Sequence, residues 1–485
     1  MRIGKTATAL LLAGGLIGAL SACSSGGDRA DGTPGGGAAH GGTDSTAGVA
    51  LTSTITAPAA FDSGKGWEIK ADWLPEGQPF PFAVSAKSGT VAHLDKTEQG
   101  YVLSVREAAS GKLLSTGKPW QAPKLTEEQS ADHTSALAVP RISLITGGGR
   151  EFFAVWARGE KRKDELHDFR QAVSAAFYPA DATGKDLAPA GAGDVEAPDG
   201  EFDNQLSVFP GAGGLLVRSS SDNFLVSPDG KVTDNGDAKV RIGGQSVDGD
   251  YHMAFPGRDG LVTNNKHEGT GEGGFGVDGG WDSAQAIPPG VEAVVEFEPV
   301  SNSVERVPNG HVVGAVGDLL IAGWGKGKKE SSAVTVSEEI SAVHDLATGR
   351  VRATAPCETA STSYAAGVPQ VTEREDVPAA VSPDGRYLVK GGNVFDLRTG
   401  RGTCTDKGEG AKEITLSSVG DDGIAYGLAG EEAPRTPVSV SAATGAAEPL
   451  SEKTITPTAM AKGAGVFITH AGQDTVRMIV LGLRH

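Results

Sequence analysis

The chain has few of the side chains that fill helical cores. Among 485 residues there are 4 methionines and 15 phenylalanines, against 70 glycines and 26 prolines. Glycine and proline interrupt helices and suit tight turns, so we expect many short strands and few helices. One ordinary core is too small for this length, which leaves two or three compact domains or one large closed array of repeats. The glycine-rich composition favours the array.

Positive charge is also scarce. Lysine and arginine together number 43 against 61 aspartates and glutamates, which gives a formal net charge of -18 at pH 7. A nucleic-acid binder needs a clustered basic surface to neutralise phosphates, so we expect no nucleic-acid partner. Acidity of this size favours solubility, and a cation-binding surface is the weaker alternative.

The apolar run near the N-terminus is short. The first 23 residues, MRIGKTATALLLAGGLIGALSAC, place Arg2 and Lys5 ahead of a glycine-rich apolar segment, which is typical of an export signal and not of a membrane-spanning helix. The end of this segment, LSAC, resembles the lipobox of bacterial lipoproteins. That resemblance implies cleavage before Cys23, diacylation of its thiol, and a protein anchored on the extracytoplasmic face of the cell membrane, because two acyl chains suffice for stable attachment. An ordinary secretory signal that ends in cysteine is the alternative.

Large apolar side chains are almost absent from the next segment, SSGGDRADGTPGGGAAHGGTDSTAGVA. Little in it offsets the entropy of ordering, so we interpret residues 23–60 as a disordered tether that follows a signal peptide at 1–22. Large side chains return with strand-like alternation in WEIKADW, which contains Trp67 and Trp73. We expect the folded domain to span residues 61–485 and to begin near Phe61.

Residues 382–401, SPDGRYLVKGGNVFDLRTGR, have the pattern of a small antiparallel sheet. Together with the residues on either side they predict four short strands joined by turns at Pro383-Asp384-Gly385, at Gly391-Gly392 and at Thr399-Gly400. One such sheet has two open edges and cannot bury its faces alone. It therefore needs neighbours of the same kind.

The same pattern of two turns recurs along the chain. A glycine turn between two strands is followed, after a variable link, by a turn like D-x-x-T-G-R. The copies are about 54 residues apart on average, near the period of known circular repeat folds. The expected first turns lie at Gly89, Gly149, Gly214, Gly260, Gly317, Gly385, Gly423 and Gly465.

The last copy ends early, after GVFITH and TVRMIVLGL. Its sheet lacks a strand that the region from Trp67 to Trp73 can supply. Pairing of the first and last segments would close the array and leave only short, protected edges.

Two copies carry a family resemblance. VSPDGRYLV with VFDLRTGR resembles the repeats of WD40-like bacterial β-propellers, and AVHDLATGR is similar to the A-x-D-x-x-T-G core of quinoprotein-like (PQQ-type) propeller repeats. The resemblance implies an all-β fold, a β-propeller of seven or eight four-stranded blades. Separate sandwich domains with similar hairpins are the alternative.

The quinoprotein resemblance implies features that this chain lacks. Those repeats carry a tryptophan a few residues beyond T-G, and the enzymes use calcium and a pair of adjacent cysteines. Here no tryptophan follows closely after Gly349 or Gly400, and no two cysteines are adjacent. We therefore expect no cofactor.

Residues 269–281, GTGEGGFGVDGGW, match the letters of the dinucleotide fingerprint at Gly269, Gly271 and Gly274. That fingerprint works only between a strand and a helix, and no helical periodicity follows it. We interpret the segment as an inter-strand loop. The alternative is that Phe275 and Trp281 form a lid over a ligand.

Metal and nucleophile motifs are missing as well. The ten histidines form no H-x-H or H-E-x-x-H pattern, and no G-x-S-x-G occurs. His252 has Asp248 and Asp250 nearby, but an exposed turn is the favoured interpretation over a cation site. We therefore name no metal ligand and no catalytic residue. A pair of catalytic carboxylates from distant blades stays open, because one sequence cannot reveal it.

Beyond Cys23, the chain has only Cys357 and Cys404. They follow the glycines of two successive T-G-R turns by eight and four residues, so in a propeller they can lie on corresponding strands of neighbouring blades. Export would place them in an oxidising compartment. We expect a disulfide between them, with two separate buried thiols as the alternative.

The segment RGEKRKDELHDFR, from Arg158 to Arg170, interrupts one copy with mixed charges. Its spacing is compatible with one helical excursion in a blade loop. We interpret it as a solvated insertion, with contact to a partner as the alternative.

The expected function is that of a binding or interaction scaffold. The sequence predicts a monomeric propeller that is held to the membrane by its lipid and binds a protein or a cell-surface ligand. A hydrolase or lyase acting on a carbohydrate or other surface polymer is the alternative. Asp384 and Asp396 are interpreted as turn and strand-end residues.

Overall fold

The structure is a computed structural model, and it describes residues 49–484 with internal gaps. The gaps are 76, 125–138, 163–164, 167, 199, 201, 203–205, 220–221, 237–239, 243–244, 248, 266–273, 292–294, 298–304, 308–309, 331–332, 358–361, 364–377, 406–411, 431–432 and 471–474. Within the described residues the only helix is the 3-10 turn η1 (Ser283–Gln285). None of these residues forms a helix with the length and apolar content of a membrane span.

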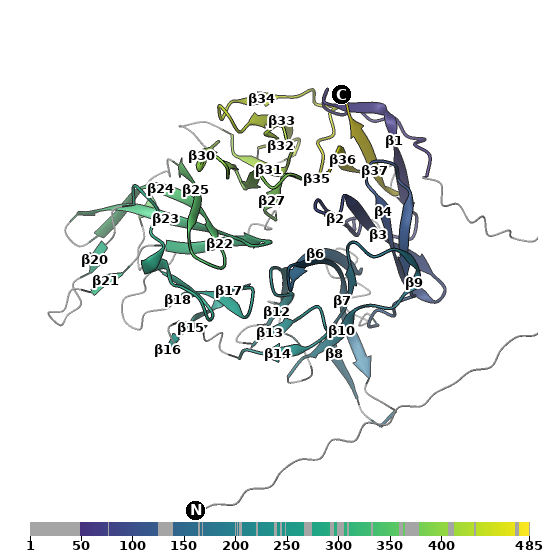
Figure 1. Cartoon of the computed structure of the whole chain (residues 1–485), viewed down its shortest axis with the longest axis horizontal. Coiled ribbons are helices and arrows are strands. Elements are labelled where there is room, and N and C mark those ends of the chain that lie inside the picture. Colours follow the sequence, from purple (N-terminus) through teal and green to yellow (C-terminus); the bar gives the residue numbers. More distant parts are fainter. Residues whose placement is uncertain are drawn as a thin grey trace, which may run out of the picture. The chain divides into compact units, whose positions relative to one another are not determined.

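Short hairpins build antiparallel sheets, which we number 1 to 8 in chain order (Figure 1). Sheet 1 contains β2 (Phe82–Ser85), β3 (Thr90–Thr97), β4 (Gly100–Glu107) and β5 (Leu113–Gly117), with β9 (Gly184–Leu187) parallel to β5. Sheet 2 contains β6 (Arg141–Gly147), β7 (Arg150–Arg162), β8 (Phe169–Pro179) and β10 (Gly191–Glu196). Sheet 3 contains β11 (Ser207–Pro210), β12 (Leu215–Ser219), β13 (Asp222–Val226) and β14 (Val232–Asp234).

Sheet 4 is the three-stranded member among the described residues. It contains β17 (Gly249–Pro256), β18 (Leu261–Asn265) and β19 (Phe275–Val277), and a separate pair, β15 (Val240–Ile242) and β16 (Gln245–Val247), contacts it. Sheet 5 contains β22 (Gly310–Val316), β23 (Leu319–Glu330), β24 (Ala333–Asp345) and β25 (Val351–Cys357). Two shorter additions are the pair β20 (Val295–Phe297) and β21 (Glu305–Val307), and β26 (Thr362–Ser363) beside β24.

The remaining sheets complete the series. Sheet 6 contains β27 (Ala380–Val381), β28 (Tyr387–Lys390), β29 (Asn393–Asp396) and β30 (Arg401–Cys404). Sheet 7 contains β31 (Ile414–Val419), β32 (Ile424–Ala429), β33 (Thr436–Ser441) and β34 (Ala447–Pro449). Sheet 8 contains β35 (Ala459–Ala461), β36 (Ala464–His470), β37 (Val476–Leu483) and β1 (Phe61–Ala71).

Consecutive sheets contact one another and the series returns to its start. The first strands of consecutive sheets contact one another from β2 through β6, β11 and β17 to β22, and again from β27 through β31 to β35. Strand β35 also contacts β2, the first strand of sheet 1. Sheets 5 and 6 join through a parallel bridge between Thr354 of β25 and Arg401 of β30. The fold is therefore an all-β propeller with eight sheets in the described residues, which agrees with the expected fold class.

Closure follows the expected route. β1 pairs antiparallel with β37, with Phe61 opposite Leu483 and Ala71 opposite Val476. The N-terminal strand thus completes the sheet that the C-terminal strands begin. The seam is held by backbone hydrogen bonds, so no long edge is left open there.

The expected first turns lie between the first two strands of their sheets, with one shift. Gly260 lies between β17 and β18, so the weak copy is a sheet of its own. In the last copy the turn residue with positive φ is Gly463, and Gly465 belongs to β36. The turn expected near Gly465 therefore centres on Gly463, two residues earlier.

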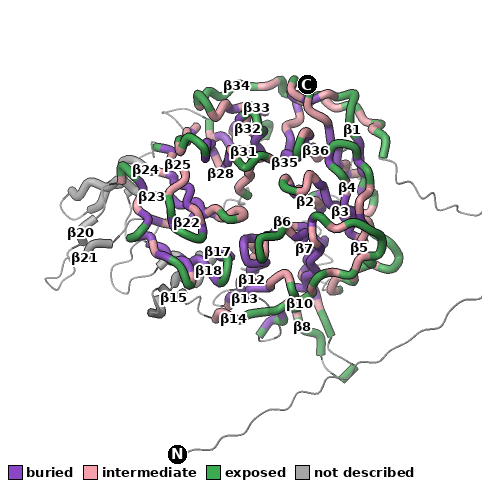
Figure 2. Tube along the Cα trace, in the orientation of Figure 1, coloured by how far each residue is buried: buried purple, intermediate pink, exposed green. Residues whose placement is uncertain are grey.

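The hydrophobic core is a series of layers between neighbouring sheets. Leu94 and Leu103 of sheet 1 pack with Phe153 and Val155 of sheet 2 in one such layer. Figure 2 shows the buried residues within the sheets, whereas outer strands such as β14 and β34 are exposed. Burial between sheets, and not within any one of them, is what requires the closed series.

Two tryptophans join neighbouring sheets at T-G-type turns. The indole N–H of Trp67 donates to the Ala108 carbonyl at 2.8 Å, and Trp281 donates to Leu346 at 3.0 Å. Each indole lies so close to the turn glycine, Gly111 or Gly349, that an added Cβ would approach ring atoms to 2.6 Å. The tryptophans come from the preceding sheet and not from residues just after the turn.

Candidate functional site

The S-P-D-G turn of sheet 6 is a hydrogen-bonded turn. The Ser382 hydroxyl donates to Asp384 at 2.6 Å, and the amide of Arg386 donates to the same carboxylate at 3.0 Å. Partial burial opposes the shift, but these hydrogen bonds lower the pKa of Asp384. The side chain therefore holds the turn in shape, as expected.

A second aspartate links this turn to the next sheet. The amide of Asp384 donates to Asp421 at 2.8 Å, and Asp421 lies in the first turn of sheet 7. Burial raises the pKa of Asp421, and the charge of Asp384 adds to this. Both residues are exposed. The contact joins two turns, and nothing in it excludes water as an active site would.

Asp396 ends β29 and begins the T-G-R turn. Arg386 donates to its carboxylate at 2.8 and 3.3 Å, and the amides of Arg398 and Thr399 donate at 2.9 and 3.2 Å. The bonds from Arg386, followed by those from the two amides, hold the pKa of Asp396 at about 2 although burial opposes them. This carboxylate is a structural anion that stabilises two turns at once.

His93 on β3 is the centre of a buried polar group. Its Nε2 accepts from Arg106 at 3.2 Å, and its Nδ1 lies 3.5 Å from Asp95. Ser104 donates to Asp95 at 2.6 Å. Burial raises the pKa of Asp95, but the charge and hydrogen bond of His93 and the bond from Ser104 outweigh it. Because the serine contacts the carboxylate and not the imidazole, the group lacks the nucleophile–base contact of a triad.

Phe275 and Trp281 are not a lid, because both side chains are buried, at 0% and 4% exposure. Phe275 packs edge-on against Trp281 and Trp324, with ring centroids 5.5 and 5.7 Å apart. His344 lies in the same cluster, where its Nδ1 is 3.1 Å from the Gly349 carbonyl and its Nε2 accepts from Trp324. Burial lowers the pKa of His344. These residues form the core between sheets 4 and 5.

Other expected features fall partly outside the described residues. Gly269, Gly271 and Asp248 lie outside them, as does Cys23. Asp250 and His252 belong to β17, so the expected exposed turn is a strand there. Among the described residues no group of three metal-binding side chains occurs.

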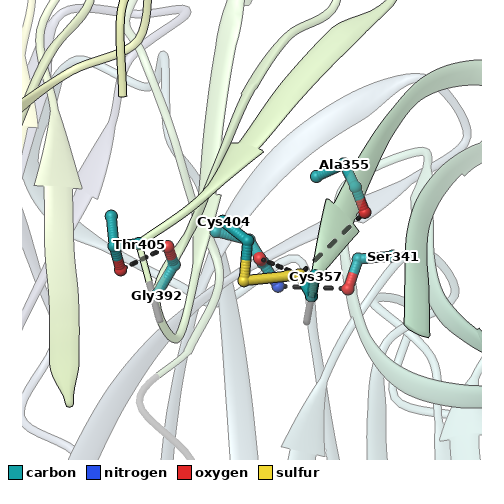
Figure 3. The surroundings of a disulfide bond; sticks show 7 residues. Ser341, Ala355, Cys357, Gly392, Cys404 and Thr405 are labelled. Atoms are coloured by element: carbon teal, nitrogen blue, oxygen red, sulfur yellow. Dashed lines mark hydrogen bonds between the residues drawn. A yellow bond between two sulfur atoms is a disulfide. The ribbon is translucent and has the colours of Figure 1, made fainter. Parts of the chain in front are cut away.

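The structure pairs Cys357 with Cys404 in a disulfide, with the two Cα atoms 5.3 Å apart (Figure 3). Cys357 ends β25 and Cys404 ends β30, the outer strands of sheets 5 and 6. Asn393 lies beside the bond and donates to Ser341 at 3.1 Å. The disulfide and this polar contact therefore join the same two sheets.

The hairpin of β7 and β8 extends past the other strands of sheet 2 (Figure 1). β6 pairs with β7 only as far as Trp156, and β10 pairs with β8 only from Ala172 onward. The paired strands continue to Arg162 and Phe169. Beyond Trp156, Lys124 bridges Glu160 of β7. We call residues 157–171 the hairpin arm, of which 163, 164 and 167 lie outside the described residues. The helical excursion expected in this segment is wrong for its described flanks, because β7 up to Arg162 and β8 from Phe169 pair as strands, and this cross-strand pairing outweighs local helical spacing.

The tip of the hairpin arm exposes apolar side chains. Leu166 is 93% exposed and Phe169 is 48% exposed, whereas large hydrophobic residues elsewhere in the described chain are mostly buried. The Arg162 guanidinium lies over the Phe169 ring at 5.5 Å, and Lys161 pairs with Asp194. The arm therefore combines an apolar tip with charged sides, and it is the candidate interaction site.

Sequence reasoning located this segment but not its exposed apolar tip. It also missed the contact of the buried His93 with Arg106, because Arg106 lies on the neighbouring strand β4. A signal for the tip was present in the letters ELHDF, where Leu166 and Phe169 interrupt a run of charges.

Comparisons with known proteins give no family for this chain. No family model matches it, and no curated protein matches it. Among solved structures, the polysaccharide lyase Uly1 is 11% identical, with a TM-score of 0.32, 87% of this chain covered and 100% of that one. A S. cerevisiae structure of Dbp5 with Nup159 and Gle1 is 10% identical, with a TM-score of 0.20 and coverages of 90% and 100%. PorZ of Porphyromonas gingivalis is 11% identical, with a TM-score of 0.16 and coverages of 75% and 46%.

Proposed function

We propose that this protein is a binding scaffold, a propeller that holds the hairpin arm out to a protein partner. The observation that carries the proposal is the exposed pair Leu166 and Phe169 at the tip of a projecting hairpin. An exposed leucine and a half-exposed aromatic ring three residues apart are typical of an anchor that a partner's apolar pocket buries. Burial of Leu166 alone would supply about 2 kcal/mol.

Charge favours a protein over a lipid surface as the partner. The segment from Arg158 to Arg170 carries acidic residues among its basic ones, and the described tip includes Glu165 and Asp168. Anionic lipid would repel those carboxylates, whereas a protein surface with both signs of charge can match them.

We further propose that the scaffold is anchored by lipid at Cys23 on the extracytoplasmic face of the membrane and carries repeats of the WD40-like or quinoprotein-like type. The LSAC segment, which resembles a lipobox, supports a lipid anchor at Cys23. The disulfide between Cys357 and Cys404 fits an oxidising compartment. Mass spectrometry of the mature N-terminus tests the anchor. A diacylated Cys23 is expected, and an unmodified N-terminus at another residue would contradict it.

Photocrosslinking tests the binding proposal. A photoreactive amino acid replaces Leu166 in the full chain, and a matched chain carries it at Val232, an exposed valine of sheet 3. We expect one discrete protein adduct from position 166 that weakens with Phe169→Ser, and none from position 232. Equal adducts from both positions, lipid adducts alone, or no adduct from position 166 would overturn the proposal.

Replacement of the exposed leucine side chain at the tip should leave the fold intact. Leu166→Ser is expected to change the free energy of unfolding by less than about 0.5 kcal/mol, because the side chain is exposed. Denaturant unfolding checks this, and the same variant should lose the adduct formed with a crosslinker at position 169. A large loss of stability would show that Leu166 packs within this chain and is not an anchor for another.

The alternative function is a carboxylate-based hydrolase or lyase on a surface polymer. The pair of neighbouring carboxylates on which such an activity would be tested is Asp384 and Asp421, where the Asp384 amide donates to Asp421 at 2.8 Å. Cleavage of a polysaccharide by the purified chain, lost in Asp421→Asn, would replace the scaffold proposal.

A further inference from the structure

The segment before β1 lies against the propeller without forming a strand of any sheet. Inward and outward residues alternate, as in a strand at a sheet edge. Leu51, Ser53, Ile55 and Ala57 are half-buried, whereas Thr52, Thr54 and Thr56 are exposed. We call residues 51–57 the N-terminal strap.

Apolar contacts hold the strap against the layer between sheets 7 and 8. Leu51, Ile55 and Ala57 pack on a buried cluster drawn from both sheets and from β1. The cluster consists of Phe61, Tyr426, Met460, Phe467, Ile479 and Leu481. The strap thus covers residues of sheet 7 and of sheet 8, the sheet to which the closing strand β1 belongs.

A buried carboxylate fixes the strap to the seam itself. Glu68 of β1 is 4% exposed, and it accepts from the Ser53 amide at 2.9 Å and from the Thr52 hydroxyl. Arg477 of β37 lies 3.9 Å from the same carboxylate and donates to the Ser53 hydroxyl. A buried carboxylate is costly unless it is paired and hydrogen-bonded. Here most of the hydrogen bonds to Glu68 come from the strap.

A third contact reaches the link between sheets 7 and 8. The amide of Ile455 donates to the Thr56 carbonyl at 2.9 Å. The strap therefore touches β1, β37 and the chain that joins the last two sheets. If the ring opened at its seam, β1 would separate from the other two segments, so the strap spans the place where the ring would open.

We infer that the N-terminal strap is a latch that locks the closure of the propeller, with the Glu68 carboxylate as its anchor. The pairing of β1 with β37 closes the ring, and the strap ties that pairing to sheet 7. Release of Glu68 frees the strap, and loss of the strap leaves a buried charge beside Arg477 with fewer partners.

Hydrogen exchange of the full chain tests the anchor. In the wild-type protein the amides of Ser53 and Ile455 should be protected. Glu68→Gln should raise their exchange at least tenfold, whereas Asp62→Asn should not. Asp62 lies in the same strand, and its carboxylate contacts Gly64 and Lys65 instead of the strap. Unprotected amides in the wild type, or equal exchange in the two variants, would overturn the inference.

Neighbouring strap residues provide a matched pair for stability. Ile55→Ser removes an inward apolar side chain, and Thr54→Ser changes an outward one. We expect the first to lower the midpoint of thermal unfolding by several degrees and the second to leave it unchanged. Equal midpoints would show that the strap rests on the propeller without holding its seam.

Discussion

Single aspartates and glycines in the repeat turns make contacts that hold each turn against a neighbouring segment. Asp396 accepts hydrogen bonds from Arg386 and from two amides of its own turn, and Gly349 leaves the space that the Trp281 ring occupies. Each residue joins a turn to something outside it. Changes at these positions should therefore cost more than changes at turn residues without such a contact.

The first prediction concerns Asp396→Asn. The pKa of Asp396 falls from 3.8 to about 2 on folding, which corresponds to at most about 2 kcal/mol of stability. Solvent near the partly exposed Arg386 screens the pair, so we expect a loss of about 1 kcal/mol at pH 7.

The pH dependence has a definite sign. Because folding depresses the pKa of Asp396, its contribution is complete above about pH 4 and is lost as the pH falls through about 2. Denaturant unfolding of wild type and variant should therefore differ at pH 7, and this difference should shrink as the pH falls through about 2 and vanish below it. A constant difference at every pH would contradict this account.

The second prediction compares two turn glycines. Gly349 and Gly385 have φ of 72° and 74°, but a Cβ on Gly349 would meet the Trp281 ring at 2.6 Å, whereas one on Gly385 would meet nothing within 4 Å. Gly385→Ala should cost about 1 kcal/mol for its backbone conformation. Gly349→Ala should cost about 2 kcal/mol more through overpacking. Equal losses in thermal unfolding would show that the indole moves aside freely.

At the scale of elements, pairing between strands decides whether a segment forms a helix or a strand, which the spacing of its charged residues does not. The hairpin arm has charges at helical spacing, yet β7 and β8 pair residue by residue from Phe152 to Arg162. The two cysteines follow a simpler rule, because each lies just beyond a T-G-R turn at the outer strand of its sheet. Their positions follow from the repeat, and their proximity follows from the contact of sheets 5 and 6.

The third prediction concerns the disulfide. It spans a sequence separation of 47 residues, so in the chain-entropy model its loss costs about 4 kcal/mol. The double variant with Cys357→Ser and Cys404→Ser should unfold at lower denaturant and should no longer respond to reductant. Wild-type protein in reductant should match it. Identical unfolding of wild type with and without reductant would contradict a stabilising bond.

At the scale of the whole molecule, closure depends on pairing and not on chain order. Phe61 lies opposite Leu483, so a short linker can join the end of β37 to the start of β1. A permuted chain that runs from residue 72 to 484 and then through 61–71 should fold as a monomer, because every sheet is complete. A chain of 72–484 alone leaves the edge of β37 open and should self-associate.

Light scattering and circular dichroism check this prediction. The permuted chain lacks the strap, so it should unfold at a lower temperature than the full protein while keeping its strand content. A monomeric chain of 72–484 with the stability of the permuted chain would show that β1 is not needed for closure.

Much of this fold could be predicted from short sequence motifs. Turns such as S-P-D-G and D-x-x-T-G-R depend on residues within four positions of one another, so their recurrence predicts the sheets and the strand that closes the last one. The predicted number of blades stayed between seven and eight because the sequence around Gly260 matches the repeat only weakly. Its sheet has only three described strands.

The sequence by itself determined the recurring turns, the need for a closing strand in the last sheet and the equivalent positions of the two cysteines in successive copies, because each follows from short-range turn chemistry repeated in order. Only the tertiary structure decided that Phe275 and Trp281 are core, that the hairpin arm is a strand pair with an exposed tip, and that Glu68 holds the N-terminal strap. Those features depend on which strands lie side by side. Burial and pairing across a sheet are set by contacts distant in sequence, which no local pattern records.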